Sequence, residues 1–205
     1  MKNSILTLLA VGALMSCEKK ETTNVNNDAD STAVSSDTAM NATPNDSTAA
    51  TATTANATSA TLNDQDKKFA DKAAMSGMAE VMLGELASTN GTNASVKTLG
   101  AMMVKDHTKA NDELKSWAST AGYTLPTSVS AEQQKTYDDL KAKKGADFDR
   151  AFADVMVTDH KKAIEEFKKE SSSGGDASLK SFAGKTLPAL EHHLMESEKT
   201  KAAVK

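Results

Sequence analysis

Three observations predict that this 205-residue chain folds as an all-α protein, an antiparallel up-down-up-down four-helix bundle. Beyond residue 62, apolar side chains recur every three or four residues in four long segments, which is the spacing of one helix face. Short runs of Gly, Asn and Ser separate most of these segments. No segment shows the alternation of β-branched and polar residues that is typical of a strand.

Capping signals set the expected bounds of each helix. Asp64 and Asp176 are the predicted N-caps of the first and last long helices. Ser130 and Gln133 form a capping box that starts a short extra helix between the second and third long helices. Gly145 is expected to end that short helix. The predicted helices are residues 64–89, 94–121, 131–144, 146–171 and 177–199.

The first residues indicate export. An apolar run from Ile5 to Met15 follows a short positive start and is too short to span a membrane, as in a signal peptide. The run ends in Leu14-Met15-Ser16-Cys17, which resembles a bacterial lipobox. We predict a signal peptide over residues 1–16 and a lipid anchor on Cys17. The lipid is expected to hold the protein at the bacterial cell envelope, on the periplasmic or surface face of the outer membrane. The alternative is an ordinary signal peptide with a chance cysteine.

Residues 17–62 are expected to form a disordered tether between the anchor and a bundle domain of residues 63–205. Thr, Ala, Asn, Ser and Asp dominate this segment, and such a composition cannot bury enough apolar area to offset its chain entropy. Three Asp-Ser/Thr-small triplets begin at residues 30, 37 and 46. They match a bacterial O-glycosylation signal or arise by chance in so polar a segment.

Composition also excludes some classes of function. The net charge is −4 and no dense basic cluster exists, so nucleic acid is not an expected partner. The sequence contains no nucleophile-elbow serine, phosphate-binding glycine loop, zinc-protease helix or cysteine pair. A conventional enzyme is therefore the class that the sequence favours least.

A duplicated motif is the main clue to a site. Residues 103–110, MVKDHTKA, return as residues 156–163, MVTDHKKA, and each copy lies on a long predicted helix. The two copies contain two of the four histidines in the chain. Helical spacing places both histidines on the inward faces of their helices.

Each of the four inward faces carries one ionisable residue: Glu80, His107, His160 and His193. These residues lie close to the midpoints of their helices, and midpoints are level in a bundle, so the four side chains should share one layer. Asp106 and Asp159 flank the histidines and are expected to orient an imidazole on a neighbouring helix.

This layer has two interpretations. It is either a hydrogen-bonded polar layer that fixes helix register, or a site for a transition metal, with neutral imidazoles and a carboxylate suited to Fe, Zn or Cu. The Glu-x-x-His pairs of di-iron bundles are missing, because Val104 and Val157 stand three residues before His107 and His160.

A second stripe, Met75, Met78 and Met82, lies on the opposite side of the first helix from Glu80. It is either covered by the short helix or by a dimer partner, or it offers thioethers to Cu(I).

Several motifs together resemble the family called domain of unknown function 4142, over residues 63–200. They are Asp66-x-x-Phe69, Ala73-Ala74, Glu80-x-x-Leu83-Gly84, Val96-Lys97, the two Met-Val-x-Asp-His copies and Leu187-Pro188-x-Leu190-x-x-His193-Leu194. The resemblance implies an exported protein with a ferritin-like four-helix bundle and assigns no activity. The hypotheses are an envelope-anchored metal-binding or metal-stress protein, or a non-catalytic structural or interaction domain with a homo-oligomeric or envelope partner.

Replacing the predicted lipid-bearing residue tests the anchor. Cys17→Ser should abolish labelling by radioactive palmitate and move the protein from the membrane fraction to the soluble fraction, because no other cysteine can carry the lipid. Ser16→Ala keeps a small residue at the cleavage site and should leave labelling intact. Undiminished labelling of Cys17→Ser would show that the lipobox interpretation is wrong.

Overall fold

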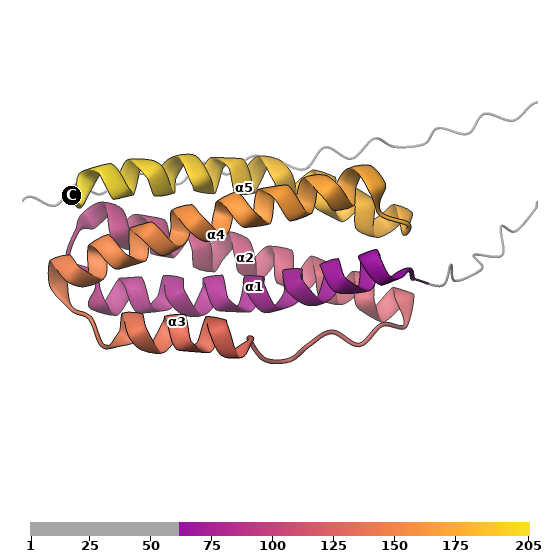
Figure 1. The fold of residues 1–205 in the computed structure, drawn as a ribbon, viewed down its shortest axis with the longest axis horizontal. Helices are drawn as coiled ribbons and strands as arrows, with labels where there is room; N and C mark the ends of the chain where they lie inside the picture. Colours follow the sequence, from indigo (N-terminus) through magenta and orange to yellow (C-terminus); the bar gives the residue numbers. More distant parts are fainter. Residues whose placement is uncertain (1–61) are drawn as a thin grey trace, which may run out of the picture. The chain divides into compact units, whose positions relative to one another are not determined.

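The structure is a computed structural model that describes residues 62–205, so the predictions for the signal peptide, Cys17 and the tether lie outside the described residues. Five helices and no strand occur between residues 62 and 205 (Figure 1). None of these helices has the length and apolar character needed to cross a membrane. The helices are α1 (Asp64–Asn90), α2 (Ala94–Ala121), α3 (Ala131–Lys141), α4 (Gly145–Ser173) and α5 (Ala177–Ala203).

The helix bounds follow the capping chemistry, with small shifts from the prediction. Asn63, and not Asp64, caps α1, because the Asn63 side chain accepts from the backbone of Asp66 while the Asp66 side chain accepts from the backbone of Asn63. The predicted capping box at the start of α3 is present. Gly145 begins α4 instead of ending α3, and its φ of +58° is a conformation that suits glycine.

The directions in which the four long helices run differ from the predicted up-down-up-down order. Gly175 donates its backbone N–H to Asp66 at 2.7 Å, and Thr92 donates its own to Asp149 at 2.9 Å. The end of α4 therefore lies at the start of α1, and the start of α4 lies at the end of α1. Since α1 and α2 form an antiparallel hairpin, α2 and α4 run in the same direction (Figure 1). The order is up-down-down-up.

The connection between α2 and α4 explains this difference. Its first part, residues 122–130, is irregular and returns along the bundle, and α3 continues in the same direction beside α1 (Figure 1). Nine extended residues cover up to about 30 Å and an 11-residue helix about 16 Å, which together match a long helix of about 40 Å. The connection is thus long enough to bring α4 back to the end of the bundle where α2 begins.

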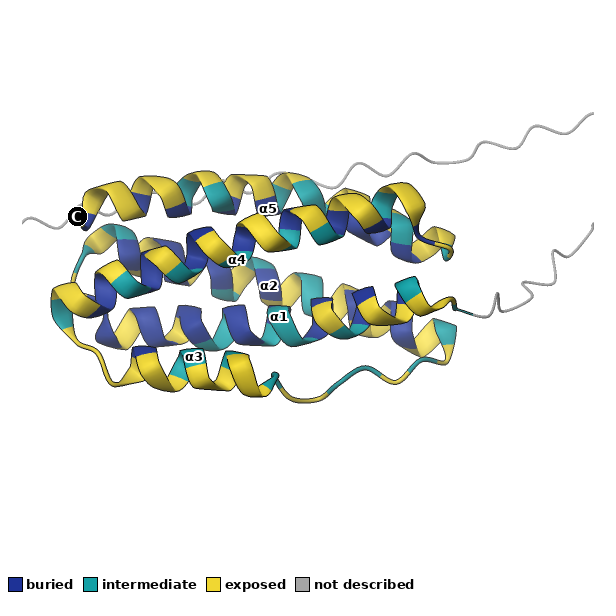
Figure 2. Ribbon diagram, in the orientation of Figure 1, coloured by how far each residue is buried: buried dark blue, intermediate teal, exposed yellow. Residues whose placement is uncertain are grey.

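The core consists of two apolar clusters at different heights. One surrounds Phe69, Trp117 and Phe167, and the other surrounds Leu99, Phe152 and Met156. On α1, α2 and α4, the predicted ionisable residue lies between the segments that contribute to the two clusters. The inward faces remain buried along the full length of the bundle (Figure 2). The fold therefore encloses a polar layer between two apolar cores.

Close contact between α1 and α2 depends on two glycines. A Cβ on Gly84 would lie 2.6 Å from the carbonyl oxygen of Gly100, and a Cβ on Gly100 would lie 2.6 Å from the Cβ of Ala87. Both contacts involve rigid atoms, so the helices would have to separate to accept a methyl group.

Gly84→Ala and Gly100→Ala should therefore each destabilise the protein by about 1–3 kcal/mol, the usual cost of overpacking. Gly184→Ala is the control, because its Cβ would meet nothing closer than 3.8 Å and alanine favours a helix. Urea denaturation of the three variants measures the changes. Equal stability of Gly84→Ala and Gly184→Ala would contradict the close approach.

Candidate metal centre

Three histidines from three helices converge in the polar layer. His107 of α2, His160 of α4 and His193 of α5 are all buried. One ring nitrogen from each lies within 4.8 Å of the others. The ring centroids are 5.2–5.8 Å apart. The prediction of a common layer is thus confirmed for the three histidines.

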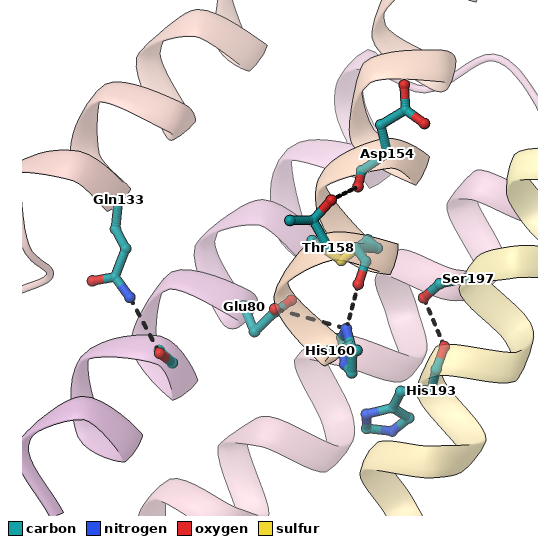
Figure 3. A network of polar contacts seen from close by, with 9 residues as sticks. Glu80, Gln133, Asp154, Thr158, His160, His193 and Ser197 are labelled. Atoms are coloured by element: carbon teal, nitrogen blue, oxygen red, sulfur yellow. Dashed lines mark hydrogen bonds and ion pairs between the residues drawn. The ribbon is translucent and has the colours of Figure 1, made fainter. Parts of the chain in front are cut away.

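Hydrogen bonds fix the orientation of two of the rings. The Nδ1 atom of His160 donates to the backbone carbonyl of Met156 at 2.8 Å (Figure 3). The Nε2 atom of His193 donates to the Asp106 carboxylate at 3.0 Å. Because both partners are acceptors, the proton sits on the bonded nitrogen and the other ring nitrogen keeps its lone pair. Asp106 thus orients an imidazole on a neighbouring helix, as predicted.

One ring nitrogen of each histidine has no hydrogen-bond partner. Nε2 of His107, Nε2 of His160 and Nδ1 of His193 are buried without a hydrogen bond. Burial lowers the pKa of His107 to about 3 and that of His160 to about 4, with the neighbouring histidines adding to both shifts. Burial also lowers the pKa of His193, against the opposing charge of Asp106. All three imidazoles are therefore neutral at pH 7, the state in which imidazole binds a metal.

Glu80 lies in the layer but outside the histidine cluster. Its Oε1 atom is 4.0 Å from Nδ1 of His160, the nitrogen that already donates to Met156, so Glu80 stands behind this ring (Figure 3). Its Oε2 atom is buried without a partner. Burial, with a contribution from the charge of Asp159, raises the pKa of Glu80 to about 8, so the carboxyl group is protonated at neutral pH in the metal-free protein.

Asp159 does not perform the predicted role. It forms no hydrogen bond with a histidine, and its charge acts on Glu80 instead. The helix geometry explains the difference, since Asp106 on α2 faces α5 with His193, whereas Asp159 on α4 faces α1 with Glu80. The fourth histidine, His192, is exposed.

A cavity of about 360 Å³ leads from the surface to this layer. It runs between α1, α3 and α4 and reaches Glu80, His107 and His160. Asn111 also lines it, and the sequence analysis missed this residue. Helical spacing could have predicted this position, because Asn111 lies four residues after His107 on the same helix face. The Asn111 amide lies over Gly77, where a Cβ would be 1.9 Å from its oxygen.

The methionine stripe is partly covered. Met75, Met78 and Met82 are half-buried, and α3 packs along α1 on this part of the bundle (Figure 1). Gln133 of α3 donates to the Ser76 hydroxyl at 3.3 Å and helps to hold α3 in place (Figure 3). The only exposed large hydrophobic residue between residues 62 and 205 is Met195.

Comparison with known proteins agrees with this fold. A profile described as Domain of unknown function (DUF4142) matches residues 50–200. The chain belongs to this family. The DUF4142 bundle is similar to a solved DUF305 fragment from Deinococcus radiodurans, with a TM-score of 0.61, 11% identity and coverage of 69% of this chain and 98% of that one.

The DUF4142 bundle is also similar to CopM, solved in a Cu(II)-bound form, with a TM-score of 0.58, 12% identity and coverage of 69% of this chain and 97% of that one. At these identities, both similarities establish a shared fold. A search of the curated proteins gave no match.

Acid should destabilise the metal-free protein through the buried histidines. The folded pKa values of His107 and His160, about 3 and about 4, lie below the ordinary value of 6.5, so the unfolded chain binds more protons below pH 6.5. Each histidine should then lower the free energy of unfolding by about 1.4 kcal/mol per pH unit until its folded pKa is reached. Glu80, whose folded pKa of about 8 lies above its ordinary value of 4.5, acts in the opposite direction and offsets about one of the two histidines over this range.

Urea denaturation between pH 7 and 4.5 measures this slope. His107→Gln and His160→Gln should reduce it, whereas His192→Gln changes an exposed residue and should leave it unchanged. Identical slopes in all three variants would contradict the burial of neutral imidazoles.

Proposed function

We propose that this protein binds one divalent transition-metal ion, Cu(II) or Zn(II), through His107, His160 and His193. The observation that carries the proposal is the convergence of three buried histidines, each of which has a buried ring nitrogen without a hydrogen-bond partner. A buried polar atom without a partner destabilises a fold by about 1–3 kcal/mol. A bound ion would satisfy all three nitrogens at once.

The surroundings of the histidines support a metal. Metal-binding histidines usually donate their second ring nitrogen to a carboxylate or a backbone carbonyl, and His193 and His160 do so here. Imidazole nitrogens hold zinc at about 2.0–2.1 Å, so the three side chains would draw together around the ion. Three neutral imidazoles suit Cu(II) or Zn(II) better than iron, because no carboxylate belongs to the cluster.

The alternative, a polar layer that only fixes packing, has less support. Such a layer would join its members by hydrogen bonds, but the three nitrogens and the Glu80 Oε2 atom all lack partners. Similarity to a copper-bound CopM structure makes Cu(II) the first ion to test. The Irving–Williams order points to the same ion.

We further propose that the metal-binding bundle acts at the bacterial cell envelope, held by the lipid on Cys17. Support comes from the Leu-Met-Ser-Cys sequence after the apolar run. A lipid-anchored bundle of this kind would capture metal ions outside the cytoplasm, as a binding or metal-stress protein without a catalytic step.

Metal titration of the purified protein tests the proposal. Wild type should bind one Cu(II) per chain, with nitrogen hyperfine structure in the electron paramagnetic resonance spectrum. His107→Ala, His160→Ala and His193→Ala should each abolish this signal, because each removes a ligand. Asp106→Asn should weaken binding about 10–100-fold, since Asp106 only orients His193.

His192→Ala is the matched control, because it removes an exposed histidine next to His193. Its affinity should equal that of wild type. Less than one Cu(II) or Zn(II) per wild-type chain, or equal loss of affinity in His192→Ala and His193→Ala, would overturn the proposal.

A further inference from the structure

The cavity that reaches the histidines is lined by carboxyl groups at increasing depth. Glu132 of α3 is exposed, Asp159 of α4 is half-buried and Glu80 of α1 is buried. All three carboxyl groups line the same cavity, on three different helices. We call these three residues the acidic series.

Two lysines also line the cavity, and together they leave part of the series uncompensated. Lys72 forms an ion pair with Glu166 across the opening. Lys162 acts on Asp159, where it opposes the effect of Glu132. With Lys72 paired to Glu166 and Lys162 set against Asp159, the charge of Glu132 remains uncompensated.

At the inner end of the acidic series, three buried polar atoms lack hydrogen-bond partners. Glu80 Oε2 is buried without a partner, and so are Nε2 of His107 and Nε2 of His160. All three residues line the cavity. A cation that moved inward would therefore pass from exposed to buried carboxyl groups and end at imidazole nitrogens.

We propose that this cavity is the access route of the metal ion, and that Glu132, Asp159 and Glu80 guide a divalent cation from the surface to the histidines. The proposal rests on the proposed metal site and adds the direction of access. Glu132 and Asp159 attract the ion through their field, which raises the association rate at low salt, and the buried Glu80 carboxyl offers an oxygen atom at the inner end of the route. The histidines supply the stable binding.

Stopped-flow quenching of Trp117 by Cu(II) measures the association rate, because Trp117 is the single tryptophan and lies ten residues from His107, about 15 Å along α2. Glu132→Gln should slow association about five-fold in low salt, and the difference should vanish near 1 M salt, where charges are screened beyond about 3 Å. The spectrum of bound Cu(II) should not change. Glu165→Gln, an exposed acid of α4 outside the cavity, is the control.

A second variant tests the route by narrowing the cavity with a larger side chain. Thr136 is half-buried at the α3 side of the cavity, and Thr136→Phe should slow association and release by the same factor, about five-fold or more, leaving the dissociation constant unchanged. Thr120→Phe is the matched control, since both hydroxyls donate to the carbonyl four residues earlier and Thr120 is exposed.

The outcomes separate the two proposals. Slower association in Glu132→Gln and Thr136→Phe, with unchanged bound spectra, supports the route. Wild-type rates in both variants overturn it. If wild type binds no Cu(II) or Zn(II), the metal site itself fails and the route fails with it.

Discussion

The removal of three imidazoles from water is the constraint on which the rest of the bundle depends. With the Glu80 carboxyl, the layer contains four buried atoms that lack hydrogen-bond partners. At about 1–3 kcal/mol each, their cost is comparable with the 5–15 kcal/mol by which most domains are stable. Apolar clusters on both sides must supply the compensating burial, which explains why the layer lies between two cores and not at an end of the bundle.

Rigid support of the layer follows from the same constraint. His160 and His193 are each held by a hydrogen bond from the nitrogen that faces away from the cluster. The helices that carry them pack against each other as a hairpin, and α2 brings His107 to the same height. A site held on helices rather than on loops keeps its geometry before any ligand arrives, which reduces the reorganisation that binding requires.

Sequence periodicity was sufficient to predict the helices, their inward faces and the height of the histidines, because these follow from local spacing. The direction in which each helix runs along the bundle was not predictable in this way. Residues 122–144 permit either order, and only packing of α3 along α1 selects the return to the starting end. The roles of Glu80 and Asp159 also depend on which helices are neighbours, so local spacing placed Glu80 in the layer but could not show that it stands behind His160.

The up-down-down-up order gives the layer an approximate two-fold symmetry. Because α2 and α4 are parallel at opposite corners, as are α1 and α5, a half-turn about the long axis exchanges His107 with His160 and Asp106 with Asp159. The same rotation exchanges His193 with Glu80. The two copies of the duplicated motif are thus related by symmetry. Glu80, however, occupies the position equivalent to His193, so one side of the layer is rich in imidazole nitrogen and the other side carries a carboxyl group.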